Sequence, residues 1–140
     1  MTYEETLHYL YTSIPVFQHS GASAYKPGLG TSIALDDYLG NPHKAYKTIH
    51  VAGTNGKGSV SHLLAAILRQ SGFKVGLYTS PHLVDFRERI RVNGKKISQD
   101  YVVDFVERHR SFFEPLHPSF FELTSSMAFA ECRWPAEPLQ

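Results

Sequence analysis

The chain has 140 residues, of which 42% are hydrophobic and 19% are charged, and its formal net charge is +1. This composition is typical of one globular domain and excludes a disordered chain, and the near-neutral charge gives no electrostatic reason to expect nucleic acid or a membrane as a partner. The sequence shows no membrane-spanning apolar stretch and no signal-peptide pattern, and its single cysteine, Cys132, excludes an internal disulfide. We expect a cytoplasmic monomer.

The first part of the chain predicts two helices joined by an extended loop. Thr2 and Glu5 have the spacing of a capping box, ahead of apolar residues at helical spacing. Prolines and glycines over residues 14–30 predict a loop. A short helix is predicted over residues 32–39, because the Gly-Asn-Pro sequence that follows it ends helices.

The middle of the chain predicts a strand, a glycine-rich loop, a helix and a second strand. Thr48–Ala52 is rich in β-branched residues and predicts the first strand. Apolar residues recur at helical spacing from Val60, and the predicted helix ends near Ser71. Lys74–Thr79 predicts the second strand. Together these segments predict a βαβ unit, which implies a parallel sheet with a right-handed crossover.

The loop Gly53–Ser59 has the composition of a phosphate cradle. Its small residues let backbone N–H groups approach oxyanions, the following helix directs unpaired amides toward them, and Lys57 adds a positive charge. The alternative is a turn that only joins strand to helix, but such a turn needs no lysine at a helix N-terminus, where the macrodipole disfavours it. Gly58 separates Lys57 from Ser59, so the loop departs from the common G-x-x-x-x-G-K-[ST] pattern. The loop indicates binding of a nucleoside triphosphate.

The rest of the chain predicts a hairpin and two helices. Asn93-Gly94 is the strongest short hairpin signal and lies between strand-like segments at residues 90–92 and 95–97. Ser98 is a suitable N-cap for a helix that ends before Pro115. A last helix is predicted to start near Ser119 and to reach Phe129.

Two residues are candidates for holding the Mg²⁺ that accompanies nucleotide phosphates. Ser80 follows the second predicted strand, at the sheet edge where open α/β folds bind ligands, although a serine before proline is more often ordinary turn chemistry. Glu122 suits either a metal ion or a solvent-facing first helical turn, and periodicity does not choose between these roles. The charge run at residues 87–91 is typical of a solvated surface with local pairing.

At these residues the chain resembles the folylpolyglutamate and dihydrofolate synthases, a family of ATP-dependent amide ligases related to the Mur ligases. The glycine between the lysine and the hydroxyl marks Mur-type ligases, and Thr79-Ser80-Pro81-His82-Leu83 narrows the resemblance to the folate branch. The resemblance extends from near the start to about Phe129. It is carried by residues 49–59, 72–83, 88–94 and 120–124.

The resemblance implies a fold, a reaction and roles for residues. The fold would be an α/β, P-loop-containing parallel-sheet domain, Rossmann-like and of the Mur ligase central type. Ser80 and Glu122 would bind Mg²⁺, and Lys57 would act catalytically on the terminal phosphates. A dihydropteroate or tetrahydrofolate carboxylate would be activated as an acyl phosphate and attacked by the amino group of L-glutamate. The residues that would bind the ATP phosphates are Thr54, Asn55, Gly56, Lys57, Gly58 and Ser59.

Members of that family are much longer. We therefore expect residues 1–129 to be the amino-terminal part of the ATP-binding ligase domain, incomplete at its carboxyl end. Residues 130–140 would be a divergent tail produced by truncation or frameshift, with the carboxy-terminal ligase domain absent and this fragment inactive. One alternative is a non-catalytic remnant that binds nucleotide weakly. Another is an unrelated phosphate-loop kinase or NTPase, against which Gly58 and the Ser80 motif argue.

Overall fold

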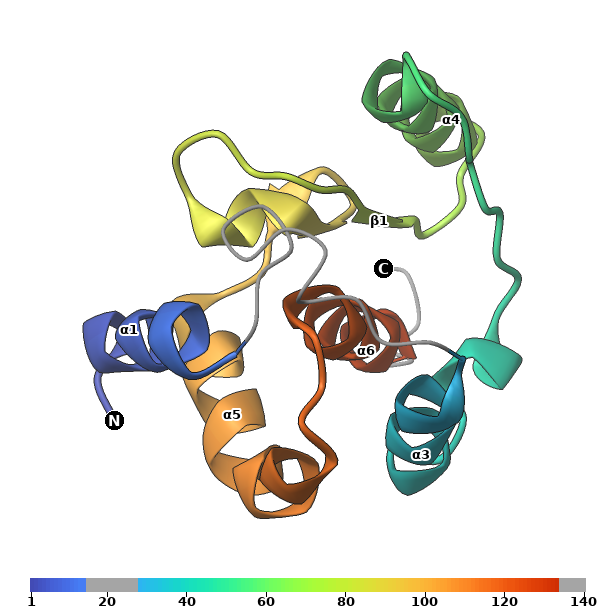
Figure 1. The fold of residues 1–140 in the computed structure, drawn as a ribbon. Helices are drawn as coiled ribbons and strands as arrows, with labels where there is room; N and C mark the ends of the chain where they lie inside the picture. The colour runs from blue at the N-terminus through green and yellow to red at the C-terminus, as the bar shows by residue number, and fades with distance from the viewer. Residues whose placement is uncertain (15–27, 134–140) are drawn as a thin grey trace. The chain divides into compact units, whose positions relative to one another are not determined.

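The computed structural model describes residues 1–14 and 28–133, which fall into two compact units (Figure 1). Unit 1 comprises Met1–Asn41 and Gln99–Met127, and unit 2 comprises Pro42–Ser98 with the residues from Ala128 onward. The predicted loop over residues 14–30 falls mostly outside the described residues. Within the described ranges, no helix is long and apolar enough to span a membrane.

Unit 1 is helical, and its core lies on the apolar sides of three helices. Leu10 from α1 (Tyr3–Ser13), Val102 and Val106 from α5 (Gln99–Phe113), and Leu123 and Met127 from α6 (Phe120–Arg133) are fully buried. Helices α1 and α5 contact each other directly. The elements are α1 (Tyr3–Ser13), α3 (Gly30–Tyr38), α5 (Gln99–Phe113), the short turn η4 (Glu114–Leu116) and α6 (Phe120–Arg133), whose last turns belong to unit 2.

The start of α1 confirms the predicted capping box. The Thr2 side chain accepts a hydrogen bond from the Glu5 N–H at 3.1 Å, and the Glu5 carboxylate accepts one from the Thr2 N–H at 2.8 Å. These bonds satisfy two backbone donors at a helix N-terminus, and such a cap is typically worth about 1 kcal/mol. The sequence pattern alone therefore located this helix start.

Unit 2 contains one long helix and a small antiparallel sheet. Strand β1 (Gly76–Tyr78) pairs with β2 (Ile90–Val92) in the register Gly76↔Val92. Strand β2 pairs with β3 (Lys95–Lys96) through a tight turn. Asn93 and Gly94 occupy that turn with φ of 51° and 79°, as the hairpin signal predicts. The elements are η2 (Pro42–Ala45), α4 (Lys57–Gln70), β1 (Gly76–Tyr78), η3 (Phe86–Arg89), β2 (Ile90–Val92) and β3 (Lys95–Lys96).

The mixed helix-and-sheet class and the predicted helices are confirmed, but one predicted strand is wrong. Thr48–Ala52 forms no strand, so the βαβ unit predicted around the glycine-rich loop is not formed in the structure. The three-stranded sheet of the described residues is antiparallel throughout. The physical reason is pairing, because a β-rich segment becomes a strand only when a neighbour takes its backbone hydrogen bonds, and none of the described strands lies against it.

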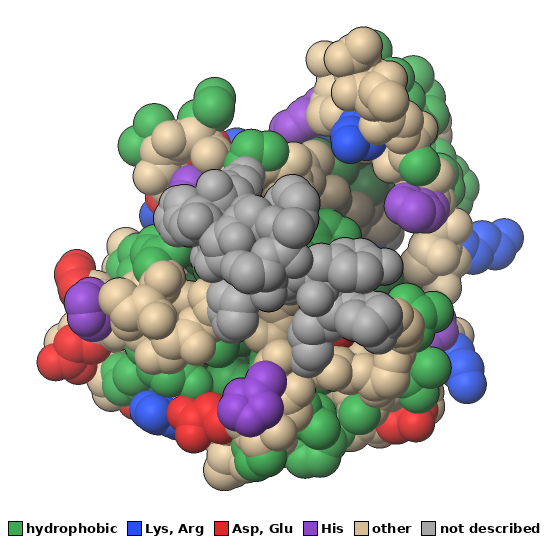
Figure 2. Space-filling view, in the orientation of Figure 1, with side chains coloured by type: hydrophobic (Ala, Val, Ile, Leu, Met, Phe, Trp, Pro, Cys, Tyr) green, Lys and Arg blue, Asp and Glu red, His purple; other side chains and the backbone are tan. Residues whose placement is uncertain are grey.

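The apolar side of α4 is exposed. Val60, Leu63 and Ile67 are 46%, 63% and 61% exposed, and no residue of α4 is buried. Hydrophobic side chains are accordingly visible over this helix in the space-filling view (Figure 2). Ile49, on the unpaired segment before the loop, is 65% exposed. An amphipathic helix normally buries such a side, so the described part of unit 2 lacks the surface that would cover it.

Matched leucine truncations distinguish the buried core from this exposed side. We expect Leu123→Ala to lower the free energy of unfolding by about 2–5 kcal/mol, because it opens a cavity. Leu63→Ala makes the same chemical change at an exposed site and should stay within about 0.5 kcal/mol of the parent. Urea unfolding followed by circular dichroism measures both. Equal losses for the two variants would contradict the exposure of α4.

Candidate functional site

The loop Gly53–Ser59, called the phosphate loop below, runs into the first turn of α4, and this junction leaves backbone donors unused by the helix. The first bond that closes a helical turn runs from the Val60 N–H to the Gly56 carbonyl oxygen at 3.0 Å. The N–H groups of Lys57, Gly58 and Ser59 precede that donor, so they have no acceptor within the helix. Residues 54–59 are all exposed. A bound anion would therefore find unpaired N–H donors and the positive end of a helix at one accessible place.

Gly56 and Lys57 give the loop its shape and charge. Gly56, the residue before the helix, has a φ of 75°, a left-handed conformation that side chains other than glycine rarely adopt. Lys57 is the first helical residue, and its side chain lies against Gly53, with Cγ 4.0 Å from the place that a Gly53 Cβ would occupy. The stem of the lysine side chain therefore lies beside Gly53 at the start of the loop.

Ser80 lies in the same unit as the phosphate loop. It comes two residues after the end of β1, the strand that α4 contacts, and its side chain is exposed. The peptide bond between Ser80 and Pro81 is cis. An exposed hydroxyl is a hard oxygen donor of the kind that Mg²⁺ prefers. The structure is therefore compatible with the prediction that Ser80 binds Mg²⁺.

Glu122 belongs to unit 1 and forms a helix cap. Its carboxylate accepts the Ser119 N–H at 3.0 Å, and its own N–H donates to the Ser119 hydroxyl at 3.1 Å, so the two residues form a capping box at the start of α6. The Ser32 hydroxyl also donates to this carboxylate at 3.2 Å. Both bonds are made to oxygen atoms of the carboxylate, the chemical type of ligand that Mg²⁺ prefers.

The prediction of a solvated charge run was wrong for Arg89. Arg89 is only 4% exposed, and its Nε donates to Nδ1 of His82 at 2.8 Å. Because Nδ1 accepts this bond, the neutral ring carries its proton on Nε2. Burial, followed by the nearby Arg89 charge, lowers the pKa of His82. His82 is therefore held as a neutral ring with a fixed tautomer, two residues after Ser80.

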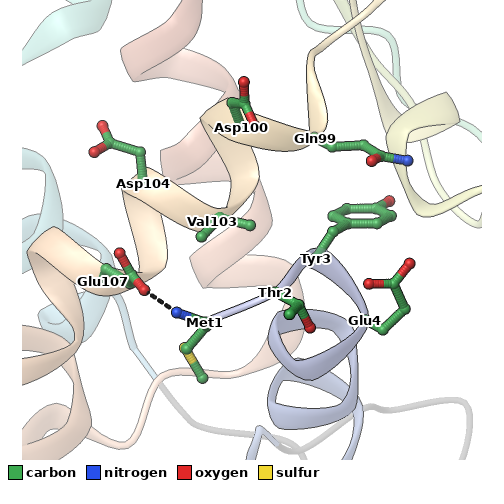
Figure 3. A pocket seen from close by; sticks show the side chains of 9 residues that line it. All are labelled: Met1, Thr2, Tyr3, Glu4, Gln99, Asp100, Val103, Asp104 and Glu107. Carbon is green, nitrogen blue, oxygen red and sulfur yellow. Dashed lines mark hydrogen bonds and ion pairs between the residues drawn. The ribbon is translucent and has the colours of Figure 1, made fainter.

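A separate pocket in unit 1 is unsuited to phosphate. It has a volume of about 480 Å³ and lies between the start of α1 and the start of α5 (Figure 3). Four acidic residues line it, and one of them, Glu107, forms an ion pair with the amino group of Met1. Negative charge of this density repels phosphate. The acidic lining residues are Glu4, Asp100, Asp104 and Glu107.

Among the described residues, no group of three or more His, Cys, Asp or Glu side chains could enclose a metal ion. Mg²⁺ that accompanies a nucleotide needs few protein ligands, because phosphate oxygens and water supply most of its coordination. Ser80 and Glu122 are oxygen donors of the kind that Mg²⁺ prefers.

Cys132 is a packing residue. It lies on the last turn of α6, where its Sγ occupies the space beside Gly76 of β1. Burial raises its pKa to about 11, so the thiol stays protonated and unreactive at neutral pH. Helix α6 ends at Arg133, so it includes the first residues of the predicted divergent tail, residues 130–140. Residues 134–140 lie outside the described residues.

Comparisons of the sequence and of the structure with known proteins point to the same family. The chain is 40% identical over 110 residues to the dihydrofolate synthase/folylpolyglutamate synthase of Bacillus subtilis, a match that covers 74% of this chain and 26% of that protein. Its structure superposes on the folylpolyglutamate synthase of Thermotoga maritima with a TM-score of 0.80 and 44% identity, covering 94% of this chain and 30% of that one. The chain is a homologue of the folylpolyglutamate and dihydrofolate synthases. No family model matches it.

These homologues also show which ligands related proteins hold. A solved folylpolyglutamate synthase in complex with AMPPCP and folate matches with a TM-score of 0.78 and 32% identity, covering 95% of this chain and 32% of that one. Our chain therefore spans about a quarter of the curated relative and less than a third of each solved chain.

Glycine substitutions in the loop test the geometry of the helix start. We expect Gly56→Ala to lower the free energy of unfolding by about 1–2 kcal/mol, because alanine is strained at positive φ. Gly58→Ala is the matched control, since Gly58 lies within the helix with no atom within 4 Å of its added Cβ, and it should be neutral or stabilising by up to about 1 kcal/mol. Urea unfolding measures both variants, and a Gly56→Ala variant as stable as the parent would contradict the left-handed helix start.

Proposed function

We propose that this chain provides the nucleotide-phosphate site of an ATP-dependent ligase that joins L-glutamate to dihydropteroate or tetrahydrofolate. The observation that carries the proposal is the junction at Lys57, where three backbone N–H groups without helical acceptors lie beside a lysine. Its support from comparison is that a homologous synthase has been solved with AMPPCP and folate.

In the proposed complex, residues 54–59 hold the triphosphate. The amides of Lys57, Gly58 and Ser59 donate to phosphate oxygens, and the start of α4 adds the favourable field of the helix dipole. The ammonium group of Lys57 contacts the terminal phosphates and neutralises part of their charge. The same residues position the γ-phosphate for attack, which is the main catalytic requirement in phosphoryl transfer.

Ser80 and Glu122 are the residues that would hold Mg²⁺ in the proposed complex. Both are hard oxygen donors, and Ser80 lies in the same unit as the phosphate loop. When bound, the ion supplies positive charge against the phosphate oxygens. Glu122 would keep its bonds from Ser119 and Ser32 while it contacts the ion, so these two residues orient its carboxylate.

The proposed chemistry has two steps. A substrate carboxylate oxygen attacks the γ-phosphorus, the bond to the β-phosphate oxygen breaks, and ADP leaves an acyl phosphate behind. The amino nitrogen of glutamate then attacks the acyl carbon and loses a proton, and inorganic phosphate leaves as the amide forms. Lys57 serves the first step, because an anionic carboxylate approaches an anionic phosphate only when positive charge offsets their repulsion.

We propose further that residues 1–129 are the amino-terminal part of the ligase domain, a piece of a parallel-sheet fold of the Mur ligase central type. The exposed apolar residues of α4 support this, since they need a covering surface that the described residues do not supply. So does the unpaired Thr48–Ala52 segment, whose β-branched sequence suits a strand with neighbours on both sides. By itself this chain would bind nucleotide without completing the reaction.

A second candidate function follows from the exposed apolar residues of α4. The exposed side of α4 also fits a non-catalytic remnant that binds nucleotide weakly. This candidate and the ligase proposal differ in what happens when further ligase segments are supplied, since only a ligase piece gains glutamate-dependent turnover.

The proposal predicts nucleotide binding that depends on Lys57. Lys57→Ala should weaken AMPPCP binding by about tenfold or more, because it removes a charged donor from the phosphates. Lys95→Ala removes an exposed lysine from β3, outside the loop, and should bind as the parent does. Fluorescence titration measures the dissociation constants, and absence of Lys57-dependent binding would contradict the proposed function.

Phosphate release from ATP in the presence of dihydropteroate or tetrahydrofolate and glutamate completes the test. We expect no glutamate-dependent release from the chain alone. We expect release when the remaining segments of a homologous synthase are added. Glutamate-dependent release by the chain alone, above the Lys57→Ala background, would exclude the remnant and would show that no further segments are needed.

A further inference from the structure

The carboxylate of Glu88 holds the segment that follows Ser80. The segment from Ser80 to Asp85 joins β1 to η3 and has no regular secondary structure (Figure 1). Three successive backbone N–H groups in it donate to Glu88: Leu83 at 3.1 Å, Val84 at 3.1 Å and Asp85 at 2.7 Å. One side chain therefore satisfies every backbone donor in the second half of the segment.

Arg89 holds the first half of the same segment. Its carbonyl oxygen accepts the Thr79 N–H at 2.9 Å, and its Nε donates to His82 at 2.8 Å. Ser80 lies between these two attachment points. Because Arg89 is buried, its guanidinium has little freedom to move, and it attaches the chain at the Thr79 backbone before Ser80 and at the His82 ring after it.

Hydrogen bonds hold most of this segment, together with an edge contact between the rings of His82 and Phe86, whose centroids lie 6.2 Å apart. The side chains of Leu83 and Val84 are 91% and 89% exposed. Glu88 and Arg89 are themselves anchored, since Phe86 in the same turn and Ile90 directly after it are 2% and 0% exposed. The order of the Ser80 segment is therefore set by polar contacts to a turn that the core of unit 2 keeps in place.

We propose that Glu88, together with Arg89, is a positioning residue that holds Ser80 in the geometry in which it binds the Mg²⁺ of a bound nucleotide. This inference rests on the proposed function, and it assigns to Glu88 and Arg89 a role that acts through the hydrogen bonds holding the Ser80 segment. A carboxylate suits the role because it only accepts hydrogen bonds and can take three N–H donors at once. A glutamine has one acceptor oxygen and an NH₂ group that opposes the remaining backbone donors.

Glu88→Gln removes this arrangement and keeps the size of the side chain. Glu4→Gln is the matched control, because it makes the same charge change at an exposed position in the first turn of α1. Calorimetric titration of the full chain with AMPPCP, in Mg²⁺ and in EDTA, measures how much the ion contributes to affinity. Hydrogen exchange of the free protein, read by NMR at each amide, measures the hydrogen bonds directly.

We expect Glu88→Gln and Ser80→Ala each to lose about tenfold of the Mg²⁺-dependent gain in affinity, as is typical when the support of a metal ligand is removed. Their affinity in EDTA should stay within about twofold of the parent, since the phosphate loop is unchanged. In Glu88→Gln, exchange at residues 83–85 should accelerate about fivefold. Exchange in α4 and β2 should match that of Glu4→Gln.

A Glu88→Gln variant that keeps the full Mg²⁺-dependent gain would overturn the inference. So would equal losses in Mg²⁺ and in EDTA, because they would show general destabilisation instead of positioning. A parent chain without Lys57-dependent binding would contradict the proposed function and the metal part of the inference together. In that case, unchanged hydrogen exchange at residues 83–85 in Glu88→Gln would separately show that the Glu88 carboxylate does not order this segment.

Discussion

The start of α4 is the constraint on which the rest of this account depends. A helix cannot pair its first backbone N–H groups internally, and here it begins at Lys57 after a glycine in the left-handed conformation. The result is a set of donors, a helix dipole and a lysine at one exposed place. Each of these features favours a polyphosphate, and the lysine in particular is unfavourable there without one. Binding of an anion resolves a local electrostatic conflict that folding alone leaves in place.

Much of the local structure could be predicted, because it is decided by residues close together in sequence. The Thr2–Glu5 box and the Asn93-Gly94 turn are contacts within four residues, and both form as predicted. The sequence carries the same kind of signal at two further places. Ser119-x-x-Glu122 and Asp85-x-x-Glu88 both have capping-box spacing, and both carboxylates act as caps in the structure.

What could not be predicted depends on contacts across the chain. Thr48–Ala52 has a strong strand sequence, but whether it becomes a strand depends on neighbours that local propensity does not encode. Arg89 lies in a run of charges that is typical of a surface, and only the fold shows that it is buried against His82. The roles of Ser80 and Glu122 as metal ligands came from family resemblance, and they stay predictions.

The most direct test of the central claim is to locate where a nucleotide contacts the chain. The amide shifts of the full chain, recorded by NMR during titration with AMPPCP and Mg²⁺, report this residue by residue. We expect saturable shifts concentrated at residues 55–59, at the start of α4, with weaker shifts around residue 80. Titration without shifts at residues 55–59, or with shifts centred on the acidic pocket of unit 1, would contradict it.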